Sequence, residues 1–182
     1  SDALLRPYMV TLTARNGPDL DERFRHLSGK LRSYHRRRSR SRQSGEVLKA
    51  LSAVWSYEFT NKGKGWHPHV HAIWLCHEAP DPFALSREWH ALTGDSYIVD
   101  VRPIDMADPV GGFCEVFKYA LKFSTLPDRE RLTAFRTLSR KRLQDSFGDL
   151  RGLDVEPTDS DELLQDLPYI ERIFTFCRGV GY

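Results

Sequence analysis

Residues 53–76, AVWSYEFTNKGKGWHPHVHAIWLC, decide the fold, because they hold two strand-forming runs joined by a glycine-rich turn. Residues 53–60 and 66–76 are rich in strand formers, and successive side chains of a strand point to opposite faces. The glycines and lysines of residues 61–65 predict the turn between the two strands. The pattern therefore predicts a β-hairpin with one apolar face and one polar face.

A four-residue loop at residues 62–65 sets which residues oppose each other across this hairpin. In that register Tyr57 lies opposite Val70 on the apolar face, and Glu58 lies opposite His69 on the polar face. A slip by one residue would turn Glu58 into the core and expose the apolar side chains. Packing and chemistry therefore favour the same register.

Histidines on the polar face of the second strand predict a divalent metal site. His67, His69 and His71 share this face because they alternate along the strand. Two imidazoles two residues apart can hold one metal ion, and Glu58 adds a carboxylate from the neighbouring strand. We predict that Glu58, His69 and His71 bind one divalent metal, Mn²⁺ or Mg²⁺. The plainer alternative is a solvated strand face that carries histidines by chance.

The rest of the sequence predicts a single α+β domain over residues 1–182, in which a central antiparallel sheet is flanked by α-helices. Alternating or strand-rich patterns predict further strands over residues 7–15, 96–104 and 169–177. Helical spacing and capping predict helices over residues 19–42, 81–93, 109–124, 128–147 and 160–166. Asp81 is the expected N-cap of the second helix, with Pro82 at its first position.

Charge and cysteine usage narrow the setting of the protein. The formal net charge is only +2, but residues 30–42 hold seven arginines and lysines and no acid. Such a block fits a protein that meets phosphate on one side, although a solvated helix end is the alternative. The three cysteines are far apart and odd in number, which favours a reducing compartment. With no apolar run of about 20 residues, we expect a cytoplasmic protein.

A second informative segment is the predicted helix that contains FCEVFKYALKF, residues 113–123. Helical spacing places Glu115, Lys118, Tyr119 and Lys122 within one arc, opposite an apolar face. A lysine beside a tyrosine favours the phenolate and offsets the charge of a phosphate, and Glu115 could accept a proton. Taken alone, the pattern also suits an amphipathic helix with ordinary surface pairs.

Together the two segments resemble the HUH endonucleases, most closely the replication initiators of small rolling-circle plasmids. His69-Val70-His71 matches the family's paired-histidine signature, and Tyr119 followed by Lys122 matches its nicking motif. Glu115 resembles the glutamate of initiators that use a single tyrosine. The resemblance covers residues 7–125, and no matching motif follows.

The resemblance implies a ferredoxin-like sheet and a metal-dependent nicking and joining of single-stranded DNA that starts rolling-circle replication. Tyr119 would form a 5′-phosphotyrosine, Lys122 would steady the phosphate, and Glu115 would serve a later hydrolysis or cleavage. Origin DNA, as a single strand or hairpin, and a host helicase are the implied partners. The expected DNA contacts are Lys118, the turn lysines Lys62 and Lys64, and Arg36, Arg37 and Arg38.

Two other readings of the sequence stay open. The alternating His67, His69 and His71 also resemble the histidine triad of nucleotide hydrolases, in which the central histidine is the nucleophile and no metal is needed. A non-catalytic ferredoxin-like domain could instead stack bases on Trp55 or Trp74, but the predicted face of both is the core. Sensitivity to a chelator separates the nuclease from the triad hydrolase.

Overall fold

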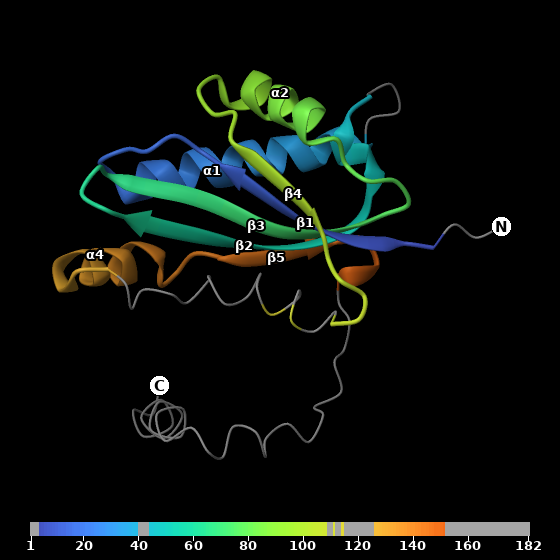
Figure 1. The fold of residues 1–182 in the computed structure, drawn as a ribbon. Coiled ribbons are helices and arrows are strands. Elements are labelled where there is room, and N and C mark those ends of the chain that lie inside the picture. Colours follow the sequence, from blue (N-terminus) through green and yellow to red (C-terminus); the bar gives the residue numbers. More distant parts are fainter. Residues whose placement is uncertain (1–3, 40–43, 109–110, 112–113, 115–125, 152–182) are drawn as a thin grey trace, which may run out of the picture. The chain divides into compact units, whose positions relative to one another are not determined.

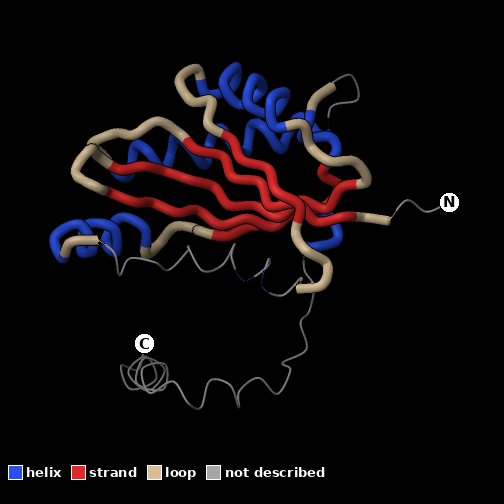
Figure 2. The backbone as a smooth tube through the Cα atoms, viewed as in Figure 1, coloured by secondary structure: helices blue, strands red, loops and turns tan. Residues whose placement is uncertain are grey.

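The computed structural model of this protein describes residues 4–39, 44–108, 111, 114 and 126–151 (Figures 1 and 2). Its centre is a five-stranded sheet in the order β4-β1-β3-β2-β5, and every neighbouring pair is antiparallel. The strands are β1 (Arg6–Thr13), β2 (Ala50–Asn61), β3 (Trp66–Cys76), β4 (Val99–Pro103) and β5 (Gln144–Phe147). The predicted α+β class with a central antiparallel sheet is confirmed.

Two of the helices, α1 (Leu20–His35) and α2 (Pro82–Thr93), cover the same face of the sheet (Figure 1). Asp81 caps α2 with Pro82 in its first turn, as predicted, and Asp19 caps the start of α1. A further helix, α4 (Asp128–Leu138), precedes β5. Short 3₁₀ turns lie at Arg36–Ser39, Glu46–Lys49 and Gly148–Leu150. None of the helices in the described residues has the length and apolarity needed to cross a membrane.

The hairpin of β2 and β3 forms in the predicted register. Glu58 pairs with His69 and Tyr57 with Val70. The last pair before the turn is Asn61 with Trp66, so the loop consists of residues 62–65. Gly65 in this loop has a φ of 85°, and a Cβ there would lie 2.7 Å from the Gly17 carbonyl oxygen. Glycine is required at such a point because another residue would strain the turn and collide with the backbone.

The core lies between the sheet and the two helices. Trp55 and Tyr57 are each 7% exposed and Trp74 is 1% exposed, and each ring contacts an aromatic ring of α1. The aromatic rings therefore pack in the core, where Trp55 and Tyr57 also line a cavity beside α1. Trp89 of α2 fixes the helix to the sheet, because its indole nitrogen donates a 2.8 Å hydrogen bond to the Thr13 carbonyl oxygen.

Three predicted elements differ from the structure. The predicted helix over 19–42 ends as an α-helix at His35, where a 3₁₀ turn of consecutive arginines begins; like charges on adjacent turns oppose a longer helix. The single helix predicted over 128–147 is wrong, because α4 ends at Leu138 and residues 144–147 form β5. The strand predicted over 96–104 is the shorter β4.

Pairing with β2 explains why residues 144–147 are extended. β5 supplies hydrogen-bond partners along the outer edge of β2, and Phe147 packs its ring against Trp55 and His35. The predicted helices over 109–124 and 160–166 and the strand over 169–177 lie wholly or mainly outside the described residues. The single domain predicted over 1–182 stays a prediction.

A histidine at the end of α1, whose Nε2 atom is buried, should make the fold sensitive to acid. The imidazole of His35 lies 4.6 Å from the ring of Trp55 and 5.0 Å from that of Phe147, measured between centroids. Burial, with a smaller contribution from the charge of Arg38, lowers the pKa of His35 to about 3. In the unfolded chain His35 becomes protonated below about pH 6.5, whereas in the folded protein it stays neutral. The contribution of neutral His35 to the free energy of unfolding is therefore complete above that pH and is lost as the pH falls toward 3.

We expect acidification from pH 7 to about pH 4.5 to lower the free energy of unfolding by about 2.5 kcal/mol more in the wild type than in His35→Phe. Urea unfolding at both pH values measures the difference. His90→Phe replaces an exposed histidine of α2 and should keep the full acid sensitivity. Equal acid sensitivity of wild type and His35→Phe would contradict the assignment.

Candidate metal centre

The two predicted metal-binding histidines stand on the sheet face opposite the helices, each beside a threonine of β1. His71 lies opposite Thr11 and His69 opposite Thr13 in the β1–β3 register. The Nδ1 atom of His71 is 3.2 Å from the Thr11 hydroxyl, and Nδ1 of His69 is 3.1 Å from the Thr13 hydroxyl. An imidazole held through Nδ1 presents Nε2 outward, which is the arrangement that second-shell partners give to metal-binding histidines.

Glu58 reaches the same point from β2. Its carboxylate oxygen Oε2 lies 2.8 Å from Nε2 of His71, and both side chains are about 15% exposed. Two ligand atoms about 2.1 Å from a shared cation lie roughly 3 Å apart, so this spacing is close to that of neighbouring ligands. The rings of His69 and His71 are stacked with centroids 6.0 Å apart.

A cleft of about 740 Å³ opens above these side chains. Glu58, His69 and His71 form part of its wall, together with the two threonines of β1. Strand β4 and the loop after it add Asp100, Arg102, Asp105 and Asp108. Next to it, His67 lines a separate cavity of about 510 Å³ with Tyr97, although its ring touches that of His69 at 4.3 Å.

Electrostatics keep His69 available as a neutral ligand. Burial, reinforced by the neighbouring His67, lowers the pKa of His69 to about 4. Burial also lowers the pKa of His67. A metal ion binds neutral imidazole, so at neutral pH His69 meets this requirement without losing a proton.

The donor set fits a divalent cation, although the side chains are not arranged around one. Nitrogen from two imidazoles with oxygen from one carboxylate suits Mn²⁺ and related metals. Among the described residues, however, no three His, Cys, Asp or Glu side chains surround a common point at ligand distance. Glu58 instead contacts His71 directly, and this contact is where a cation would have to enter.

The other predicted site residues fall into two groups. Lys62 and Lys64 are exposed at the hairpin turn, whereas Arg36–Arg38 form the 3₁₀ turn after α1 and so belong to the helix-covered side. The predicted catalytic Glu115, Tyr119 and Lys122 lie outside the described residues, as does the predicted DNA contact Lys118. Their distance from the histidines is therefore a prediction.

The threonines were missed by sequence reasoning. Thr11 and Thr13 alternate along β1 in the same way as the histidines along β3, and this is the only signal that they carry in the sequence. Recognising them required knowing that β1 pairs with β3 in this register, which is a long-range contact.

We compared the sequence with protein-family models and with curated proteins, and the structure with solved structures, and none of the three comparisons gave a match.

Proposed function

We propose that this protein is a metal-dependent endonuclease that nicks single-stranded DNA through Tyr119, in the manner of the HUH initiators of rolling-circle replication. The observation that supports it most is the pair of threonine-anchored imidazoles next to the Glu58 carboxylate in an open cleft. This constellation suits a divalent cation on a phosphate.

In this proposal each side chain of the cleft has a distinct task. Glu58, His69 and His71 would hold the cation, which when bound supplies Lewis-acid polarisation of the scissile phosphate. Thr11 and Thr13 would hold the imidazoles in place through Nδ1. The open cleft leaves room for the phosphodiester beside these ligands.

Tyr119 is the proposed nucleophile. Its phenolic oxygen would form a bond to the phosphorus while the bond from phosphorus to the 3′ oxygen breaks. The phenol gives up its proton, with Glu115 as the acceptor, and the leaving 3′ oxygen ends as a hydroxyl. Lys122 would offset charge on the phosphate. The products are a 5′-phosphotyrosine and a free 3′-OH that can prime synthesis.

The test is the formation of a covalent adduct. The full chain is incubated with Mn²⁺ and a pool of random-sequence, 3′-labelled single-stranded oligonucleotides, and the products are separated on a denaturing gel. We expect a labelled band at the mass of protein plus DNA, which EDTA abolishes. Strand cleavage that persists in EDTA without an adduct would favour the triad hydrolase, and no adduct from any pool would overturn the proposal.

Thr13→Val should weaken Mn²⁺ binding about tenfold, because second-shell partners contribute that much to metal affinity. The substitution keeps the shape of the side chain and removes only the hydroxyl that lies 3.1 Å from Nδ1 of His69. Thr60→Val is the matched control, since Thr60 is on β2 and pairs with His67 instead. Calorimetric titration with Mn²⁺ measures both variants, and equal affinities would contradict an anchoring role.

A further inference from the structure

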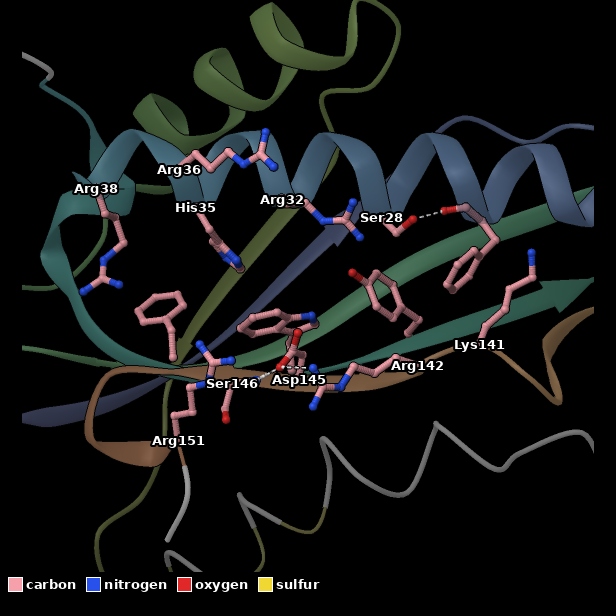
Figure 3. A pocket seen from close by; sticks show the side chains of 14 residues that line it. Ser28, Arg32, His35, Arg36, Arg38, Lys141, Arg142, Asp145, Ser146 and Arg151 are labelled. Atoms are coloured by element: carbon pink, nitrogen blue, oxygen red, sulfur yellow. Dashed lines mark hydrogen bonds and ion pairs between the residues drawn. The ribbon is translucent and has the colours of Figure 1, made fainter. Parts of the chain in front are cut away.

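A second cavity lies on the opposite face of the sheet, between α1 and the edge strand β5 (Figure 3). It is a groove of about 660 Å³. Arg32 and His35 descend into it from α1, and Arg142 and Asp145 reach it from the segment that leads into β5 and from β5 itself (Figure 3). The rings of Trp55 and Tyr57 belong to its lining.

The groove is strongly basic. Six cationic side chains line it, namely Arg32, Arg36, Arg38, Lys141, Arg142 and Arg151. Asp145 is the only acidic side chain among the described lining residues, and it lies 3.4 Å from Arg142. Lys141 is also paired, with Asp21 outside the lining. With both pairs and Arg36 set aside, Arg32, Arg38 and Arg151 still leave the lining with an excess of positive charge, and such a concave basic surface attracts polyanions.

Aromatic rings form the floor of the groove. Trp55, His35 and Phe147 pack against one another with centroids 4.6 to 6.0 Å apart. The guanidinium carbon of Arg38 lies 3.8 Å from the centroid of the Phe147 ring, and the same group donates a 2.8 Å hydrogen bond to the Leu51 carbonyl oxygen. Cation–π contact and hydrogen bond hold Arg38 in one position, so its charge is preorganised.

Two polar atoms of this floor point to a ligand. The indole nitrogen of Trp55 and Nε2 of His35 are buried and make no hydrogen bond of ordinary geometry within the described residues. Trp55 is 7% exposed and its indole N–H has the Tyr57 hydroxyl as a weak partner, so Nε2 of His35 is the atom that lacks one among the described residues. A buried polar group without a partner is costly, so its presence in a cavity wall indicates that something else supplies the partner.

We propose that this groove is a second DNA-binding site, which holds the phosphate backbone of a single strand and needs no metal. The choice of ligand rests on the proposed nicking function, since that function requires the protein to hold single-stranded DNA. β2 connects the two sites, because Glu58 faces the histidines and Trp55 faces the groove. Among the described strands, β5 alone lies outside β2 at this edge of the sheet.

The experiment measures binding of fluorescently labelled oligo-dT to the full chain by anisotropy in EDTA, over a series of salt concentrations. The groove variant combines Arg32→Ala, Arg142→Ala and Arg151→Ala, which are all exposed positions. We expect its affinity to fall at least about tenfold and its slope of log K against log salt to fall by about 2, because three phosphate contacts are lost.

A control of equal charge separates the groove from net charge. It combines Arg25→Ala, Arg87→Ala and Arg129→Ala, exposed residues that do not line the groove, and it should keep nearly the wild-type slope. If the two triple variants lost the same amount of oligo-dT affinity and of salt slope, the proposal would be overturned.

A conservative substitution tests whether the floor of the same groove contacts the ligand. Trp55→Phe keeps an aromatic ring in the core and removes the indole N–H, so we expect about threefold weaker binding. Unchanged affinity would overturn the assignment of the groove floor to the ligand. Because EDTA excludes metal-dependent chemistry, these results do not depend on the Tyr119 adduct. If no adduct forms but the groove variant loses oligo-dT binding, only the nuclease proposal is overturned. If the adduct forms but the groove variant binds oligo-dT as the wild type does, only the groove proposal is overturned.

Discussion

Replacing His69 and His71 together with alanine is expected to abolish Mn²⁺ binding and to reduce the covalent DNA adduct below detection. The two imidazoles supply both nitrogen donors of the proposed site, and Glu58 alone would hold a hydrated cation only weakly. We expect the Mn²⁺ affinity to fall more than about 100-fold. Calorimetric titration measures the metal, and a denaturing gel measures the adduct.

The matched control removes two exposed imidazoles instead, in His77→Ala with His90→Ala. It should bind Mn²⁺ and form the adduct as the wild type does. Both double variants should keep the circular dichroism of the wild type, because the His69 and His71 side chains face the cleft and not the core. If the His69 and His71 variant kept wild-type metal affinity, the metal centre would be wrong.

Tyr119→Phe is expected to eliminate the adduct completely while leaving the binding of Mn²⁺ and single-stranded DNA unchanged. The substitution removes only the phenolic oxygen, so no bond to phosphorus can form, whereas the aromatic ring is preserved. A 3′-labelled oligonucleotide reports the adduct, and anisotropy reports binding.

Tyr97 offers a discriminating comparison, because it is an exposed tyrosine beside His67. Tyr97→Phe should form the adduct at the wild-type level. Should Tyr97→Phe lose the adduct and Tyr119→Phe retain it, the nucleophile would be Tyr97 and the match of residues 119–122 to the nicking motif would be fortuitous.

The hairpin could be predicted from sequence because all its information is local. The four-residue loop and the alternation of polar and apolar side chains agree on one register, and that register brought Glu58 opposite His69. Buried Trp55 and Trp74 followed from the same alternation. Short-range patterns of this kind leave few alternatives.

The pairings between strands that are far apart in the sequence could not be predicted from the sequence alone. Nothing in residues 6–13 states that β1 lies beside β3, so the contacts of Thr11 and Thr13 with the histidines stayed hidden. Residues 144–147 were read as helix because their extended form depends on the free edge of β2, which lies far away in the sequence. The basic groove has the same origin, since its walls come from α1 and β5.

The position of β3 has a consequence for how the protein can change. Its histidines stand on the middle strand of the sheet, with a neighbour paired along each side, while the segment after β4 adds residues 104, 105 and 108 to the wall of the cleft. Substitutions in this segment can therefore change the shape of the cleft without disturbing the imidazole geometry. Selectivity could thus diversify, by mutation or by design, on a chemical scaffold that stays constant.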